Sequence, residues 1–99
     1  MRNHVYHTYI LMNQSDSVLY VGMTNDIARR MAEHKTGEVP GFTQRYKLTK
    51  LVWLEAFKDV KQAIGREKQL KNWRRDWKLN LIRDSNPELA DLSATWLNA

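Results

Sequence analysis

The feature that most constrains the fold is a pair of strand-like segments joined by a very short link. Tyr6–Met12 (YHTYILM) is rich in aromatic, β-branched and aliphatic residues, and residues 18–22 (VLYVG) have the same character. The residues between them, NQSDS, are typical of turns, so the chain must reverse direction there. A link this short favours an antiparallel hairpin. A chain of 99 residues then has room for one domain built on that hairpin.

Downstream of the hairpin, the pattern predicts a helix, a loop and a third strand. Residues 24–26 (TND) supply helix-capping side chains, and an apolar stripe at helical spacing follows over residues 27–35. Residues 35–41 (KTGEVPG) end that helix with two glycines and a proline. We read residues 42–50 as a mixed basic and aromatic loop and residues 51–57 (LVWLEAF) as a strand.

The last third of the chain is expected to be helical. Asp59 is a suitable N-cap for a long helix from about Val60, and a shorter helix follows to about Arg83. The resulting β-β-α-β-α-α order indicates an α+β fold around a small three-stranded sheet. We expect one domain over residues 1–84 and a mildly acidic tail over residues 85–99, with one weak turn in it around residues 92–97.

Charge and composition narrow the partners. All 16 Lys and Arg lie at or before Arg83, and only 8 of the 11 acids do, so residues 1–83 carry a net charge of +8. A basic surface of this kind attracts polyanions, with nucleic acid as the leading candidate, although a solvated helix face is the alternative. The chain has no cysteine, which excludes disulfides and thiolate metal sites. It has no apolar run long enough to span a bilayer, and we expect a soluble, cytoplasmic protein without a membrane partner.

One carboxylate falls on the apolar side of the long helix. At 100° per residue, the apolar stripe consists of Val60, Ala63, Ile64 and Leu70, and Glu67 lies near its middle. A carboxylate that faces the core is costly unless a partner compensates it. Two explanations remain open: a structural acid paired with an arginine or a tyrosine hydroxyl, or a cleft residue that binds a cation.

Two further groups could complement that acid. Arg30 and His34 are spaced i, i+4 and share one face of the first helix, whereas Arg29 points toward solvent. Together they could hold a phosphate, or they could be ordinary solvated side chains. Tyr9 and Tyr20 are central in the two hairpin strands, where a tyrosine is most often part of the core.

Several motifs in the expected order resemble one known family. The residues that carry the resemblance are Tyr9-Ile10-Leu11, Leu19-Tyr20-Val21-Gly22-Met23-Thr24-Asn25, Ala28-Arg29-Arg30, Glu33-His34-Lys35, Gly41-Phe42-Thr43 and Ala63-Ile64-Gly65-Arg66-Glu67-Lys68-Gln69-Leu70-Lys71. They resemble the GIY-YIG nuclease superfamily over roughly residues 6–83, and look closest to its small stand-alone bacterial proteins. The resemblance implies a mixed α/β domain with a central three-stranded antiparallel sheet.

The resemblance also implies a catalytic site. It places the two signature tyrosines at Tyr9 and Tyr20, the invariant arginine at Arg30, a histidine known from some restriction-enzyme relatives at His34, and the metal-binding glutamate at Glu67. Glu67 is then expected to bind one Mg²⁺ or Mn²⁺, largely through water. Tyr9 would orient or deprotonate the attacking water, Tyr20 would help to position it, and Arg30 would neutralise charge in the transition state. His34 would contact the phosphate or assist proton transfer.

Some positions depart from the family pattern. The first tripeptide reads His7-Thr8-Tyr9, so its glycine and isoleucine are absent, and the second reads Tyr20-Val21-Gly22. Met23 stands where relatives from nucleotide-excision repair often carry a basic residue. Many relatives also carry an asparagine on the last helix, for which Asn72 and Asn80 are both candidates.

The expected function is a metal-dependent endonuclease of low sequence specificity that acts on DNA, branched or single-stranded substrates included, in repair or processing. A protein partner could supply targeting. Residues expected to contact backbone phosphates are Arg45, Lys47, Lys68, Lys71, Arg74, Arg75 and Lys78. Aromatic residues lie among them, namely Phe42, Tyr46, Trp73 and Trp77. An exposed one could stack on a nucleobase, whereas core packing is favoured for Trp73 or Trp77. The alternatives are a catalytically inactive nucleic-acid-binding module of the same fold and an interaction domain for an acidic protein.

Overall fold

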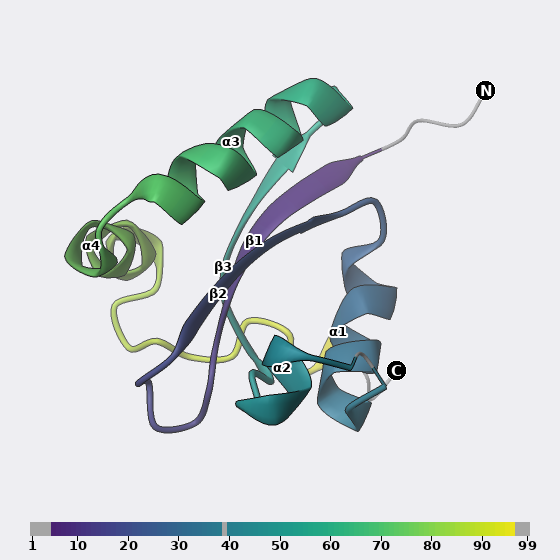
Figure 1. The fold of residues 1–99 in the computed structure, drawn as a ribbon, viewed down its shortest axis with the longest axis vertical. Helices are drawn as coiled ribbons and strands as arrows, with labels where there is room; N and C mark the ends of the chain where they lie inside the picture. The colour runs from purple at the N-terminus through teal and green to yellow at the C-terminus, as the bar shows by residue number, and fades with distance from the viewer. Residues whose placement is uncertain (1–4, 39, 97–99) are drawn as a thin grey trace.

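A computed structural model describes residues 5–38 and 40–96 and shows a small sheet with helices on both faces (Figure 1). Its elements are β1 (Tyr6–Met12), β2 (Leu19–Thr24), α1 (Ile27–Thr36), α2 (Phe42–Arg45), β3 (Lys50–Phe57), α3 (Val60–Asn72) and α4 (Arg75–Ser85). The predicted α+β class and the predicted order are confirmed, with one addition. The segment read as a loop contains the short helix α2, which is a single turn too brief to produce a periodic pattern.

The three strands form an antiparallel sheet in the order β2-β1-β3, with β1 in the centre. In the β1–β2 register, Tyr9 lies opposite Gly22 and Leu11 lies opposite Tyr20. Residues directly opposite one another point to the same face of a sheet, as do alternate residues of one strand. The register therefore places Tyr9, Tyr20 and Gly22 on one face, next to one another.

The two faces of the sheet are covered by different helices. In Figure 1, α3 and α4 lie on one side of the strands, and α1 and α2 lie on the other. The core on the α3–α4 side consists of Ile10, Met12, Val21, Val52, Trp53, Leu70, Ile82 and Leu89. The core on the α1–α2 side consists of Tyr9, Leu11, Met31, Leu48 and Leu51. Central strand β1 contributes to both cores, as the alternation of its side chains requires.

Capping residues set the start of α1 and α3 and the end of α1. Asp26 caps α1 by accepting a hydrogen bond from the Arg29 backbone N–H, and Asp59 caps α3 in the same way with Lys61, as predicted for that residue. Gly37 ends α1 in the left-handed conformation with φ 74°, which a residue without a Cβ adopts at little cost.

The segment after α4 returns across the sheet toward α1 (yellow in Figure 1). The Asn86 side chain donates to the Val52 carbonyl at 3.0 Å, and the Leu92 backbone N–H donates to the Leu51 carbonyl at 2.7 Å. The Asp91 carboxylate accepts bonds from Lys35 and from the Leu51 backbone N–H. A turn covers residues 92–95, and residue 97, which the sequence also assigned to it, lies outside the described residues. These contacts tie the C-terminal segment to the third strand and to the end of α1.

Within the described ranges, none of the helices combines the length and the apolar character needed to cross a bilayer.

Candidate active site

The two tyrosines of the hairpin lie over a glycine that leaves room for both. Tyr9 is only 2% exposed, and its ring centroid lies 6.3 Å from that of Tyr20. A Cβ atom added at Gly22 would stand 2.6 Å from the Tyr9 hydroxyl oxygen and 2.8 Å from Cε2 of Tyr20. Distances this short are not compatible with a side chain. The glycine of the second tripeptide is therefore required by the close approach of the tyrosines.

His34 is buried against the Tyr9 hydroxyl. The Tyr9 oxygen and Nε2 of His34 are 3.3 Å apart, in a hydrogen bond that links β1 to α1. Burial, together with the positive charge of Arg30, lowers the pKa of His34 below its ordinary value. The ring is therefore neutral at pH 7, and one of its nitrogens can accept a proton. Its other nitrogen, Nδ1, is buried and has no hydrogen-bond partner in the described part of the chain.

The Tyr9 hydroxyl holds its proton firmly. Burial raises its pKa well above the ordinary value of 10.0, and the neighbouring Tyr20 adds to the shift. The positive charge of Arg30 lowers the pKa but is outweighed, while the negative charges of Glu67 and Glu33 raise it further. A base role for Tyr9 needs a cation that lowers this pKa, and the charge of Arg30 alone does not bring it down to the ordinary value. Because both Arg30 and Glu67 influence this pKa, both charges lie within electrostatic range of the hydroxyl.

Arg30 sits at the rim of the same cluster. Its side chain is 34% exposed and lies 3.6 Å from the Glu33 carboxylate, while its Nε is buried and unpaired within residues 5–38 and 40–96. With Met23, Thr24, Asn25 and Tyr6, it lines a small cleft of about 270 Å³. The neighbouring Arg29 is 60% exposed and points toward solvent, as the helical spacing predicted. Arg30 thus combines an anchored stem with donors that can still reach an anion.

Glu67 lies at the margin of the buried stripe of α3 and not at its centre. Ala63 and Leu70 are fully buried, whereas Ile64 is only partly buried and the Glu67 side chain is 21% exposed. The buried face is therefore centred between Ala63 and Leu70, about 50° from Glu67 at 100° per residue. The helical wheel treated the whole apolar set as one stripe and so placed the acid too deep. Its carboxylate reaches solvent and pairs with the Lys71 ammonium at 3.0 Å.

The accessible carboxylate of Glu67 suits a hard cation that keeps most of its water. The described residues contain no group of three or more His, Cys, Asp or Glu side chains that could enclose a metal ion. Mg²⁺ and Mn²⁺ are often held at phosphate sites by one or two carboxylates with several waters, so a single accessible carboxylate fits such an ion. Thiolate or multi-histidine coordination does not fit these residues.

The predicted DNA-contacting residues differ in whether their side chains are already paired within the protein. Arg45, Lys47 and Lys68 are exposed, and no ion pair engages them in the part of the chain that the structure describes. The others are partly engaged: Lys71 pairs with Glu67, Arg74 pairs with Asp76 at 2.9 Å, Arg75 donates to the Asp16 carbonyl, and burial lowers the pKa of Lys78.

The aromatic residues divide between packing and exposure. Trp73 packs against the α3–α4 core, but Trp77, for which core packing was favoured, is 48% exposed and meets Trp73 edge-on at 6.1 Å. Phe42 on α2 is 49% exposed and stacks on Tyr20, with 6.3 Å between the ring centroids. Sequence reasoning did not connect Phe42 to the tyrosines, because that contact exists only once α2 forms. The two asparagine candidates, Asn72 and Asn80, are both exposed.

Comparisons with known proteins show which family and fold the chain is similar to. Residues 5–80 match the profile of the GIY-YIG catalytic domain. The chain is 34% identical to a UPF0213 protein of Haloquadratum walsbyi over 79 residues, covering 80% of this chain and 89% of the relative. It is 36% identical to a UPF0213 protein of Syntrophus aciditrophicus over 88 residues, covering 88% and 95%. The solution NMR structure of a UPF0213 protein from Bacillus halodurans has a TM-score of 0.57 at 25% identity, covering 92% of this chain and 97% of that one.

Proposed function

The chain belongs to the GIY-YIG family, and on that premise we propose that it is an endonuclease that hydrolyses DNA phosphodiester bonds with the help of one divalent cation. The observation that carries the proposal is the convergence of charge and hydrogen bonding on one hydroxyl. Tyr9 is bonded to His34, packed beside Tyr20 and influenced by the charges of Arg30 and Glu67. These residues come from both strands of the hairpin and from helices on both sides of the sheet, and a purely structural cluster has no need of such a mixture.

Glu67 is the residue that would hold the cation, Mg²⁺ or Mn²⁺. When bound, the ion polarises the scissile phosphate and stabilises the leaving 3′ oxygen. The Lys71 ammonium pairs with this carboxylate at 3.0 Å and compensates its charge. Lys71 would then turn toward a DNA phosphate when the acid binds the cation.

Tyr9 and His34 form the route for the proton of the attacking water. Burial raises the pKa of Tyr9, which favours the protonated hydroxyl at neutral pH. Tyr9 can orient water through its hydroxyl and pass its own proton to the neutral His34, 3.3 Å away, as it receives one. The ring of Tyr20 lies beside this pair, with its centroid 6.3 Å from that of His34.

Arg30 and the exposed basic residues would bind the substrate. The Arg30 guanidinium, anchored on α1, offers donors to the phosphate as negative charge builds up. Exposed cations such as Arg45 and Lys68 would contact backbone phosphates, which gives affinity without reading bases. We therefore propose low sequence specificity, a role in DNA repair or processing, and a protein partner as the source of any targeting.

A plasmid-nicking assay tests the proposal. Wild-type protein is expected to nick supercoiled and branched DNA only when Mg²⁺ or Mn²⁺ is added, and Glu67→Gln is expected to lower the rate by ~10²–10³-fold. Glu88→Gln is the matched control, since Glu88 is exposed and its loss should leave the rate unchanged. Metal-independent nicking, or equal rates for wild type and Glu67→Gln, would contradict the proposal. Retained DNA binding without any cleavage would instead favour a catalytically inactive binding module.

A further inference from the structure

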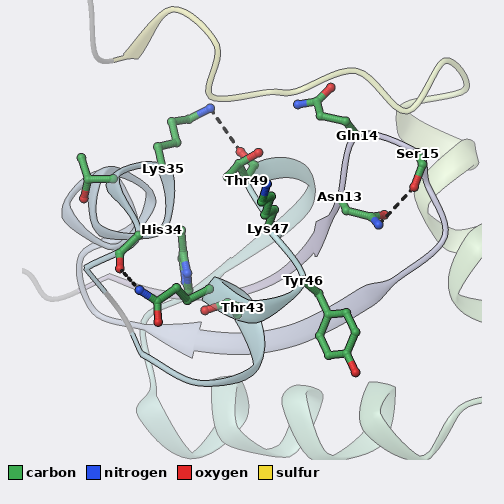
Figure 2. Close-up of a pocket in the computed structure, with 12 residues that line it drawn as sticks. Asn13, Gln14, Ser15, His34, Lys35, Thr43, Tyr46, Lys47 and Thr49 are labelled. Carbon is green, nitrogen blue, oxygen red and sulfur yellow. Dashed lines mark hydrogen bonds between the residues drawn. The ribbon is translucent and has the colours of Figure 1, made fainter.

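A second cavity lies beside the candidate active site, and the proposed nuclease mechanism does not use it. It has a volume of about 610 Å³, within the range of small-molecule sites. Three segments enclose it: the β1–β2 turn, the end of α1, and α2 with the link to β3 (Figure 2). The lining residues that matter below are Asn13, Gln14, His34, Lys35, Gln44 and Lys47.

Most of the described residues that line the cavity carry polar groups and none is an acid, although apolar atoms make up the larger part of its surface. Lys35 is neutralised by Asp91 and also donates to the Thr49 carbonyl at 3.2 Å. Lys47 is exposed and forms no ion pair within the described ranges, and Figure 2 shows it near the middle of the group. The cavity therefore presents one uncompensated positive charge surrounded by hydroxyls and amides. Such a surface fits a ligand that joins an anion to a polar ring system.

Some of the polar groups are already committed and others are free. The Asn13 side chain holds the turn through Ser17 and Val18, and the Gln44 amide donates to the Gly37 carbonyl at 2.9 Å. Gln14 is exposed, and no hydrogen bond is recorded for its side chain among the described residues. Figure 2 shows Gln14 reaching over the cavity from the turn. The committed groups make the walls firm, while Gln14 and Lys47 remain available to a ligand.

The cavity shares a wall with the candidate active site. His34 lines the cavity and is also the hydrogen-bond partner of Tyr9. At the rim, Tyr46 packs on Phe42 with 4.7 Å between ring centroids, and Phe42 in turn stacks on Tyr20. A ligand in the cavity would therefore contact the same histidine that faces the Tyr9 hydroxyl.

We propose that this cavity is a nucleotide subsite, which takes one nucleotide of the substrate strand next to the scissile phosphate. Lys47 binds the nucleotide's phosphate, and Gln14 with the threonine hydroxyls faces its sugar and base. The assignment to the substrate strand rests on the proposed nuclease function, whereas nucleotide binding itself does not.

Titration with deoxyadenosine 5′-monophosphate, followed by NMR without added metal, tests the binding. We expect shifts at His34, Lys47 and Gln14, and tighter binding of the nucleotide than of deoxyadenosine or inorganic phosphate alone. Lys47→Asn should weaken binding about tenfold through loss of a charge-assisted bond. Asparagine is chosen because Lys47 has a φ of 54°, a conformation that asparagine tolerates. Lys47→Arg should restore binding, and Lys58→Asn, at the other end of β3, is the matched control.

A second measurement ties the cavity to the substrate strand. In the nicking assay, Lys47→Asn should raise KM several-fold with little change in kcat, because a ground-state contact is lost. Absence of shifts at His34 and Lys47 at millimolar nucleotide would overturn the subsite, whatever the nuclease activity. Nucleotide binding with an unchanged KM would exclude the substrate strand as its occupant. Nucleotide binding in a protein that cleaves no DNA would support the nucleotide site and contradict the proposed function instead.

Discussion

The two faces of the sheet are built for different tasks. On the α3–α4 face, Ile10, Leu70 and Ile82 are completely buried in an apolar cluster, and the Thr8 hydroxyl in that layer donates to the Ala63 carbonyl at 2.8 Å. On the α1–α2 face, the buried set includes Tyr9 and His34, and the unpaired Nδ1 of His34 lies there as well. Among the described residues, the Thr8 hydroxyl on the first face is satisfied, while the buried Nε of Arg30 and the buried Nδ1 of His34 on the second face have no partner.

This difference indicates where stability and chemistry reside. A buried donor or acceptor without a partner costs about 1–3 kcal/mol, so it is retained only where the rest of the fold compensates for it. The apolar cluster on the opposite side of β1 is the evident source of that compensation. We therefore expect substitutions in the apolar cluster of the α3–α4 face to act mainly on stability, and substitutions of polar residues on the α1–α2 face to act mainly on catalysis. Glu67, at the margin of α3, is the exception, since it is proposed to hold the cation.

The largest expected effect is on stability. Leu70→Ala removes a fully buried side chain from the α3–α4 cluster and should lower the free energy of unfolding by about 2–5 kcal/mol. Tyr9→Phe keeps the ring in place and loses only the bond to His34, so it should cost about 0.5–1.5 kcal/mol. Urea unfolding followed by circular dichroism measures both. Equal destabilisation by the two substitutions would contradict the expectation that the α3–α4 face contributes more to stability than the α1–α2 face.

The next effect is on rate. Arg30→Ala should lower the nicking rate by ~10²–10³-fold, because it removes a donor to the developing phosphate charge. Its unfolding free energy should change little, since about a third of the side chain is exposed. Arg29→Ala is the control one residue away, 60% exposed and directed toward solvent, and should leave the rate near that of wild type. If both substitutions reduced the rate equally, the loss of one positive charge would explain the effect, and a specific role of Arg30 at the phosphate would be contradicted.

Much of the α3–α4 face could be predicted from the sequence, because its strands and helices show themselves in the composition and spacing of neighbouring residues. Tyr6–Met12 could be recognised by its aromatic, β-branched and aliphatic composition, because this central strand is buried on both faces. The helical spacing of Ala63 and Leu70 follows from burial on one side of α3. The strand bounds were accurate to within two residues for the same reason. The acid on that helix was found by its unusual position, but its depth was misjudged, because a wheel does not show which part of the stripe meets the sheet.

The α1–α2 face depends on contacts that a linear pattern does not contain. Phe42 reaches Tyr20 only because four residues form α2, and the Lys35–Asp91 ion pair joins positions far apart in the chain. The candidate residues on this face were identified through family resemblance, whereas their neutral, buried state comes from three-dimensional packing. The exposure of Trp77 is a similar case, since hydrophobicity alone favoured the core.

A smaller effect distinguishes two glycines. Gly22→Ala would place a methyl group 2.6 Å from the Tyr9 hydroxyl, and overpacking of this kind typically costs about 1–3 kcal/mol. Gly65→Ala meets nothing within 4 Å on α3 and should stabilise the protein by about 0.5–1 kcal/mol through helix propensity. Thermal unfolding of the two variants measures the contrast. Opposite signs are expected, and a neutral Gly22→Ala would show that the tyrosines can move apart.

The smallest effect is a dependence of stability on pH that belongs to the α1–α2 face. Burial lowers the pKa of His34 from its ordinary value of 6.5, so the unfolded chain takes up a proton before the folded protein does. The contribution of His34 to stability is therefore constant above about pH 7. It falls as the pH drops through 6.5, until the folded protein is protonated as well.

Asp91 titrates at lower pH and does not contribute in this range. Burial raises the pKa of its carboxyl, but hydrogen bonds from Lys35, Ser93 and Leu51 outweigh burial and bring that pKa below the ordinary 3.8. The stabilisation that Asp91 provides is therefore lost only at lower pH. His7, whose pKa burial also lowers, contributes a similar slope, so the comparison must be made between wild type and His34→Gln. Urea unfolding between pH 5 and pH 7.5 should show a shallower fall in stability for the variant, and an identical slope would mean that His34 is protonated as readily in the folded protein as in the unfolded chain.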